Sequence, residues 1–189
     1  EKDASLCEAS GVDLIFHPEP KEMYHSDFSS FVDMHGLTES LCGKSRPAHF
    51  RGVCTVVTKL FNIVQPDCAY FGQKDAQQLA VIQQMVRDLN LDVTVIGCPI
   101  IREADGLAKS SRNSYLSADE RKAALVLSQA LEVAKQLLAN GEQNAAKIRN
   151  AISETIQAEP LAKVDYVELV DARTLQQVDS VERPVLVAL

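Results

Sequence analysis

The stretch CAYFGQKDAQQLAVIQQMVRDLNLDVTVIGCPI, residues 68–100, decides the fold of this chain. It opens on an apolar run, Cys68–Phe71, of the kind that forms a buried strand, and the polar turn Gly72–Asp75 follows. Residues Ala76–Asn90 have the spacing of an amphipathic helix, and Asp92–Ile100 is a second apolar strand. A strand, a helix and a strand in this order form a βαβ unit, whose right-handed crossover makes the two strands parallel.

The residues upstream of this unit predict one further long helix. Apolar side chains recur at i, i+3, i+4 and i+7 over Gly52–Val64, and Pro66 ends the pattern. The other upstream elements that we expect are an acidic helix, two strands and a polar loop: Lys2–Ala9, Val12–Phe16, Ser30–Met34 and Cys42–Arg51.

The second half of the chain has a different organisation. Asp105-Gly106 is a turn signal, Ser117–Glu120 is a capping box that opens a long amphipathic helix, and Asn140-Gly141 ends that helix. A helix, a strand, a short helix and a last strand are expected at Asn144–Ala158, Val164–Val170, Thr174–Val178 and Val185–Leu189. We therefore predict an α/β domain over residues 1–101 and a smaller α+β domain over residues 102–189.

The composition is that of an ordinary globular chain. Of its 189 residues, 46% are hydrophobic and 24% are charged, which excludes collagen-like, low-complexity and disordered proteins. The net charge of −7 argues against a general nucleic-acid or anionic-membrane binder. Residues 44–112, however, hold nine basic and six acidic side chains, and this local charge of +3 indicates a site for a small anion.

The cysteines and the apolar runs point to a cytoplasmic protein. The five cysteines are odd in number and lack a C-x-x-C pair, so we interpret them as reduced thiols and not as a disulfide framework or zinc site. Cys54, Cys68 and Cys98 lie in apolar runs and are expected to be small buried side chains. No apolar stretch reaches the roughly 18 residues of a membrane span, and the first residues do not resemble a secretion signal.

The turn Gly72–Asp75 is the first candidate site, because open α/β sheets bind ligands where a parallel strand leads into a helix. Free backbone N–H groups and the positive end of the helix dipole favour an anion there. Lys74 adds a mobile positive charge. Asp75 either accepts from sugar hydroxyls or caps the helix, as in a capping-box variant with Gln78. The alternative is a plain helix cap beside a solvated lysine.

Gln78 is the second candidate. On a helix it projects in the same direction as Ile82, Met85 and Leu89, and therefore lies at the head of the apolar stripe. A buried amide without a partner costs about 1–3 kcal/mol, so we expect it to be hydrogen-bonded. Its partner is a ligand at the strand ends or, alternatively, a backbone group of the sheet.

Two more segments gather charge. Lys109–Asn113 places two hydroxyls between two cations, a pattern that binds phosphate, and Gly106 ahead of it allows a mobile loop. A polar linker is the alternative. The other segment is a basic cluster of four residues in one loop, Lys44, Arg46, His49 and Arg51. Here the alternative is a solvated loop. We interpret three further histidines as loop or packing residues: His17, His25 and His35.

Together these motifs are specific. FGQKD-x-x-Q at residues 71–78 and DGLAKSSRN at residues 105–113 closely resemble the pantothenate synthetase (pantoate–β-alanine ligase) family. They lie within two longer matching stretches, RPAHFRGVCTVVTKLFNIVQPDCAYFGQKDAQQLAVI and CPIIREADGLAKSSRNSYLSADER. The resemblance extends along the chain and includes VDYVELVDARTL at residues 164–175.

The resemblance implies a Rossmann-like nucleotidyltransferase domain, with an incomplete parallel sheet, followed by the smaller α+β domain. It also implies a reaction in which ATP and magnesium convert pantoate to pantoyl adenylate with release of pyrophosphate. β-Alanine then attacks the adenylate to give pantothenate and AMP. The family further suggests a homodimer.

The resemblance assigns roles to residues of this sequence. ATP binding falls to Gly72, Gln73, Lys74, Asp75, Ile101, Lys109, Ser110, Ser111 and Arg112. Four of these stabilise charge during the reaction: Lys74, Ser110, Ser111 and Arg112. Gln78 binds pantoate, and Arg46 and His49 belong to a substrate loop. Magnesium bridges phosphate oxygens without a direct protein ligand.

The family's His-x-Gly-His motif is not among these residues, and its members continue beyond Leu189. We therefore expect a fragment that does not synthesise pantothenate alone; ATP- and β-alanine-dependent AMP release would contradict this. One alternative is another adenylyl- or cytidylyltransferase of the same superfamily, which ATP–pyrophosphate exchange with another acid would reveal. A second alternative is a non-catalytic nucleotide-binding or dimerisation fragment.

Overall fold

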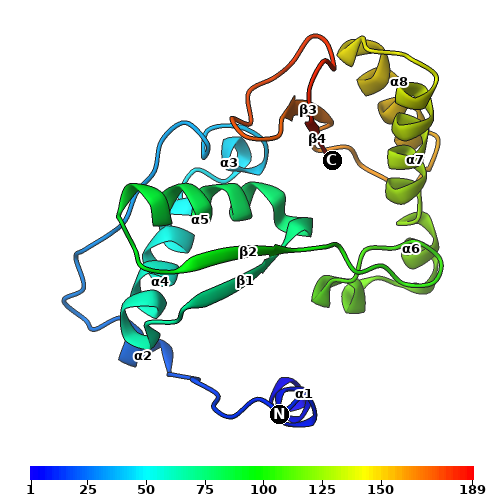
Figure 1. The fold of residues 1–189 in the computed structure, drawn as a ribbon. Coiled ribbons are helices and arrows are strands. Elements are labelled where there is room, and N and C mark those ends of the chain that lie inside the picture. Colours follow the sequence, from blue (N-terminus) through cyan, green and yellow to red (C-terminus); the bar gives the residue numbers. More distant parts are fainter. The chain divides into compact units, whose positions relative to one another are not determined.

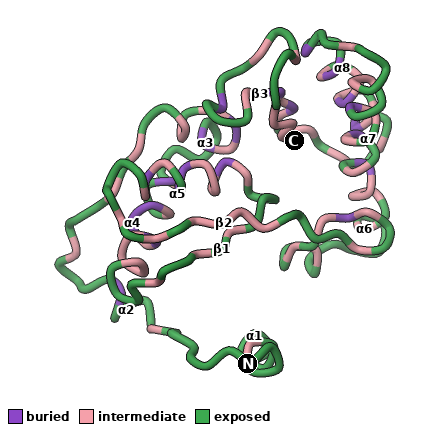
Figure 2. The backbone as a smooth tube through the Cα atoms, in the orientation of Figure 1, coloured by how far each residue is buried: buried purple, intermediate pink, exposed green.

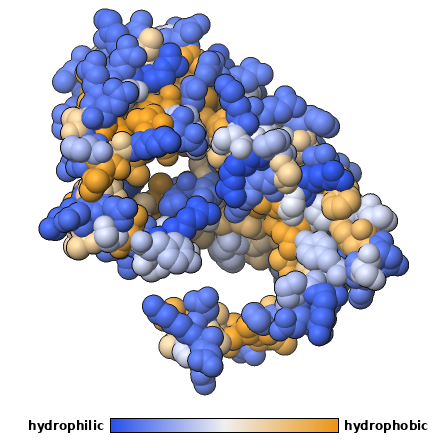
Figure 3. Space-filling model, turned by 180° about the vertical axis from the view of Figure 1, so that it is seen from behind, coloured by the Kyte–Doolittle hydropathy of each residue, from blue (hydrophilic) through white to orange (hydrophobic).

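The computed structural model describes all residues 1–189, which form two compact units, Glu1–Phe31 and Val32–Leu189. The first unit contains α1 (Lys2–Ala9), as predicted, and a short helix, α2 (Pro20–Met23). The predicted strand Val12–Phe16 is wrong, because this segment has no partner strand and its side chains are exposed. They form part of the apolar surface at the bottom of Figure 3.

The second unit is built around the predicted βαβ motif. Its parts are β1 (Cys68–Gly72), a 3₁₀ turn η1 (Gln73–Asp75), α5 (Ala76–Asp88) and β2 (Thr94–Cys98). The two strands are parallel, with Cys68 opposite Thr94 and Gly72 opposite Cys98, which confirms the prediction (Figure 1). The capping box expected at Asp75 and Gln78 does not form, because Asp75 makes no side-chain hydrogen bond at the start of α5.

Two helices precede β1. They are α3 (Cys42–Ser45) and α4 (His49–Val64), so the predicted loop Cys42–Arg51 is in part helical. The predicted strand Ser30–Met34 is also wrong. Its Val32 N–H donates to Thr55 Oγ1 at 3.0 Å, a side chain of α4, and not to a neighbouring strand.

A core between α4, α5 and the sheet holds this part of the unit together. Its buried side chains are Phe50, Cys54, Val57, Val81, Ile82 and Met85. Figure 2 marks buried positions of α4 and α5 in purple. Burying one such large side chain fully contributes about 1.5–3 kcal/mol. The buried stripe of α5 runs through Val81, Ile82 and Met85, while Leu89 is exposed.

The rest of the second unit contains helices and a small antiparallel sheet. The elements are η2 (Ser111–Tyr115), α6 (Ala118–Ala123), α7 (Val126–Ala139), α8 (Ala145–Gln157), β3 (Glu168–Asp171) and β4 (Val185–Ala188). The capping box of Ser117 and Glu120 forms as predicted, and β3 pairs with β4. The long helix expected after it is divided at residues 124–125 into α6 and α7.

Two predictions near the carboxyl end of the chain need correction. The strand expected at Val164–Val170 begins only at Glu168. The short helix expected at Thr174–Val178 is a turn, in which Leu175 has a φ of +56° and Gln177 forms a bridge with Val170. A left-handed residue is incompatible with a continuing right-handed helix.

Three clusters of buried side chains organise the second unit. One lies between α4, α5 and β1, and another packs α7 and α8 against β3. Leu41, Val170 and Leu175 form a third, small cluster with contributions from β4 and α5. The domain boundary near residue 101 stays a prediction.

Two further expectations concern solvent and membranes. Cys54 is buried, as predicted, but Cys68 is exposed, because it lies on the outward face of β1 together with Tyr70. None of the helices has the length and apolar character that crossing a lipid bilayer requires.

Candidate functional site

The candidate site is a cavity of about 500 Å³ at the carboxyl end of β1. Seven of the residues predicted from the sequence line it: Gln73, Lys74, Asp75, Gln78, Arg112, Arg46 and His49. They come from three separate segments of the chain. The fold therefore brings the predicted ATP turn, the predicted phosphate segment and the predicted substrate loop around one space.

The turn after β1 provides the first wall. Gly72 ends the strand, and a Cβ atom there would meet nothing within 4 Å, so the strand end is open. The backbone then turns through η1 into α5, whose amino-terminal N–H groups favour an anion. Lys74 Nζ lies 3.8 Å from Asp75 Oδ1. This pair leaves the lysine near the mouth of the cavity and one-third exposed.

The segment after β2 provides the second wall. A bridge between Arg102 and Ala108 forms a small hairpin, and Gly106 occupies its turn with a φ of +97°, which favours glycine. Lys109 N–H donates to Ile101 O at 2.9 Å and so ends the hairpin. Arg112 follows in η2 and reaches the cavity.

Five predicted site residues do not line the cavity: Gly72, Ile101, Lys109, Ser110 and Ser111. Gly72 and Ile101 are each adjacent in the sequence to a residue that lines the cavity. Ser110 uses its hydroxyl to accept from the backbone N–H of Arg112 at 3.3 Å, and thereby caps η2. Of the basic cluster, Lys44 faces a different cavity, and Arg51 does not line this one.

The cavity is electrically positive. Arg46, Lys74, Arg102 and Arg112 line it, whereas Asp75 is its only Asp or Glu side chain. Burial lowers the pKa of His49 below its ordinary value, and the guanidinium groups of Arg46 and Arg112 lower it further. His49 is therefore neutral at pH 7, and the cations keep their attraction for an anion.

Gln77, and not Gln78, is the buried amide of α5. Gln77 is 6% exposed, while Gln78 is half-buried and lines the cavity. The apolar stripe is rotated toward residues 77, 81 and 85, since Leu89 is outside the core. In the sequence, Gln77 stands four residues before Val81. This spacing places Gln77 on the same face of α5 as Val81, which is buried.

Several lining residues were not predicted from the sequence. Among them are Cys42, Gln77, Arg102, Tyr166 and the residues 186–189 at the carboxyl end of the chain. Burial raises the pKa of the Cys42 thiol, although Arg46 opposes this, and burial also raises the pKa of Tyr166. No local pattern connects these distant segments, so only the fold reveals them.

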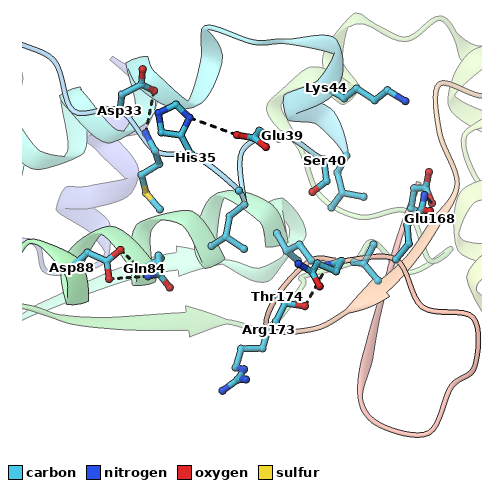
Figure 4. Close-up of a pocket in the computed structure, with 18 of the residues that line it drawn as sticks. Asp33, His35, Glu39, Ser40, Lys44, Gln84, Asp88, Glu168, Arg173 and Thr174 are labelled. Carbon is cyan, nitrogen blue, oxygen red and sulfur yellow. Dashed lines mark hydrogen bonds and ion pairs between the residues drawn. The ribbon is translucent and has the colours of Figure 1, made fainter.

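A larger cavity of about 1180 Å³ is lined in part by residues of the segment 33–44 (Figure 4). Several of its charged groups already have partners, as in the ion pair of His35 with Glu39. Of its three cations, Arg87 pairs with Asp88 at 3.5 Å, and Lys44 and Arg173 point in opposite directions in Figure 4. The smaller cavity is the better candidate, because its charges converge at the end of a parallel strand.

Comparison with known proteins gives consistent results. The model of the family "Pantoate-beta-alanine ligase" matches residues 1–189. The chain is 59% identical over 189 residues to pantothenate synthetase of Clostridium acetobutylicum, and spans 67% of that protein. It superimposes on pantothenate synthetase of Thermus thermophilus with a TM-score of 0.94 and 44% identity, covering 97% of this chain and 67% of the other.

A third protein was solved with ligands. It is pantoate–β-alanine ligase from Francisella tularensis, complexed with β,γ-ATP and β-alanine. The TM-score is 0.72 and the identity 31%, over 90% of this chain and 61% of the other.

Proposed function

Because the chain belongs to the pantoate–β-alanine ligase family, we propose that the cavity at the end of β1 binds ATP and pantoate. The family condenses pantoate with β-alanine at the expense of ATP, through pantoyl adenylate, and releases pyrophosphate and AMP. The proposed ATP residues are Gly72, Gln73, Lys74, Asp75, Ile101, Lys109, Ser110, Ser111 and Arg112. Gln78 binds pantoate, and Arg46 and His49 belong to the substrate side.

One observation carries this assignment. Lys74 and Arg112, from two motifs that are distant in the sequence, line the same positive cavity at the amino end of a helix. Triphosphate is the anion that such an arrangement suits, because its charge needs several cations and N–H donors. The ATP in the Francisella complex supports the same ligand class.

The chemistry follows from these charges. In the first step a carboxylate oxygen of pantoate attacks the α-phosphorus of ATP, and the bond to pyrophosphate breaks. Two anions approach each other, so Lys74 and Arg112 stabilise the charge that develops on the phosphate oxygens. In the second step the amine of β-alanine attacks the acyl carbon, and AMP leaves.

We also propose a magnesium ion bound with ATP. Asp75 is the only Asp or Glu side chain lining the cavity, so the protein offers one carboxylate side chain as a ligand. This fits an ion held mainly by phosphate oxygens and water, as is usual for magnesium. The ion would neutralise charge on the phosphates.

Calorimetric titration with ATP and magnesium tests the proposal. We expect Lys74→Ala and Arg112→Ala each to weaken ATP binding about tenfold or more, since each removes a charge-assisted contact. Lys163→Ala, which removes an exposed lysine outside the cavity, is the matched control and should leave the affinity unchanged. Equal affinities for all four proteins would exclude this cavity as the ATP site.

A homodimer is the second part of the proposal. It is supported by the family resemblance and by the exposed Ile63 and Val64 at the end of α4, which are 51% and 52% exposed. Sedimentation velocity measures the mass directly. A chain that sediments as a monomer at concentrations well above those of the calorimetric titration would contradict the homodimer.

A further inference from the structure

Gln77 makes three hydrogen bonds from a buried position. Its Nε2 donates to Leu37 O at 2.8 Å and to Ser40 O at 2.7 Å, and its Oε1 accepts from Cys42 Sγ at 3.0 Å. Both amide protons are thus used. These partners all belong to the segment 37–43, so a single side chain of α5 holds that segment at three points.

The segment itself is tightly folded. Leu41 has a φ of +51°, which is unusual for a residue with a side chain. A Cβ atom at Gly43 would lie only 1.9 Å from Thr38 O, so only glycine fits there. Leu41 also packs with Val170 and Leu175. The segment is therefore packed from a second side, independently of Gln77.

Backbone hydrogen bonds connect this segment to the cavity. Ser40 O accepts from Gln77 and also from Gly43 N–H at 3.0 Å. Gly43 O accepts from Arg46 N–H at 3.3 Å, and Arg46 O accepts from His49 N–H at 3.0 Å. Arg46 and His49 both line the cavity. Four consecutive hydrogen bonds thus connect the amide of Gln77 to the backbone of Arg46 and His49, two residues that line the cavity.

Gln77 is not itself one of the proposed ligand-binding residues. It directly precedes Gln78, and its helix begins at the proposed ATP turn. A displacement of the segment relative to α5 would move Arg46 away from Lys74 and Arg112. Figure 4 shows part of the same segment, with Glu39, Ser40 and Lys44 labelled among the residues that line the larger cavity.

We propose that Gln77 is a positioning residue, which holds the segment 37–43 against α5 and thereby keeps Arg46 and His49 at the ATP and pantoate cavity. The inference rests on the proposed function for the role of the cavity. Whether Gln77 holds the segment in place can be tested separately from the proposed function.

Thiol labelling tests the grip. The chain is treated with iodoacetamide, and the rate at each cysteine is followed by mass spectrometry of its peptides. In Gln77→Leu and Gln77→Glu, we expect Cys42 to react about fivefold faster, because its hydrogen-bond acceptor or the packing around it is lost. Gln83→Leu, at an exposed glutamine of the same helix, should leave the rate unchanged. An unchanged Cys42 rate in both Gln77 variants would overturn the proposal.

Cys54 reports on unfolding in the same experiment. It is fully buried, and burial raises the pKa of its thiol to about 11, so it reacts only when the core opens. If Cys54 also reacts faster in the Gln77 variants, Cys42→Ala and Cys42→Ser decide the matter through their ATP affinities. A loss in the alanine variant that serine restores supports the proposal, and equal affinities contradict it.

A double-mutant cycle tests whether Gln77 acts through Arg46. Calorimetry gives the ATP affinities of Gln77→Leu, Arg46→Ala and the double variant, because the Arg46 guanidinium adds to the positive charge of the cavity that attracts ATP. We expect each single change to weaken binding about tenfold and the double variant to be no weaker than the single ones. Additive losses, or no effect of Arg46→Ala, would overturn a positioning role through Arg46. If the unchanged chain binds no ATP, the proposed function fails, while the labelling result still decides the grip.

Discussion

Arg121 Nη2 lies 2.8 Å from Asp105 Oδ2, and this ion pair joins the turn of the second cavity wall to helix α6. The same nitrogen lies 3.0 Å from Glu103 Oε2. One guanidinium therefore holds the first arm and the turn of the hairpin that leads to the proposed phosphate residues. Arg112 follows this hairpin, so its place at the cavity depends on how firmly the hairpin is held.

We predict that Arg121→Gln weakens ATP binding about threefold, because partly exposed ion pairs contribute modestly. Titration calorimetry measures the change. Lys122→Gln is the matched control on the same helix, since it breaks only the exposed pair with Asp119. Similar affinities for the Arg121 variant and the control would show that the hairpin keeps its position without the ion pair.

The acid–base behaviour of His49 gives a second prediction. Burial, Arg46 and Arg112 lower its pKa, so NMR titration should place its midpoint below 6.5. The folded chain binds this proton less tightly than the unfolded chain. Stability from this group is complete above pH 6.5 and is lost as the pH falls through the lowered pKa of the folded state.

The variant Arg46→Ala should raise the His49 midpoint while burial keeps it below 6.5. Lys44→Ala is the control, as this lysine faces the other cavity. A midpoint that does not move in Arg46→Ala would place the guanidinium farther from the imidazole than the structure has it.

Two glycines give opposite expectations for the same substitution. Gly43→Ala should lower the free energy of unfolding by about 1–3 kcal/mol, because the new Cβ would collide with Thr38 O. Gly52→Ala should raise it by about 0.5–1 kcal/mol, because Gly52 lies exposed within α4 with open space around it. Urea unfolding curves measure both. Equal effects would contradict the folded form of segment 37–43.

The hydrogen bonds of Asp171 predict part of the loss of folding stability at low pH. Its Oδ1 accepts from Thr174 N–H at 2.8 Å and Arg173 N–H at 3.0 Å, and these bonds lower its pKa below 3.8. The resulting stability is present above pH 3.8 and is lost as the pH falls through the lowered pKa. In urea unfolding, Asp171→Asn should therefore be less stable than wild type at pH 7, and the two should converge as the pH falls below the lowered pKa of Asp171. A constant difference would contradict this.

The sequence predicted the βαβ unit correctly because its signals are local. Apolar spacing defines the helix, and the runs beginning at Cys68 and Asp92 contain the strands on either side. Val12–Phe16 has the same apolar character but is not a strand, because a strand also needs a partner. Sequence pattern therefore identified the segments able to form strands and not those that pair.

The candidate site was predicted in part. Lys74 and Arg112 were found because motif chemistry is visible in the sequence, and both line the cavity. Gln77 was missed, since one helix turn does not fix which of two adjacent glutamines faces the core. Cys42 and Tyr166 were missed for a different reason, because only tertiary packing brings them to the cavity.

The cavity is lined by residues of segments that are distant in the sequence, among them His49, Lys74 and Leu186, and this has a consequence during synthesis on the ribosome. The βαβ unit and its core are complete once β2 has left the exit tunnel, and such local units fold early. The last wall arrives only with β4. In a nascent chain the open strand end therefore forms before the cavity that we propose to bind ATP is complete.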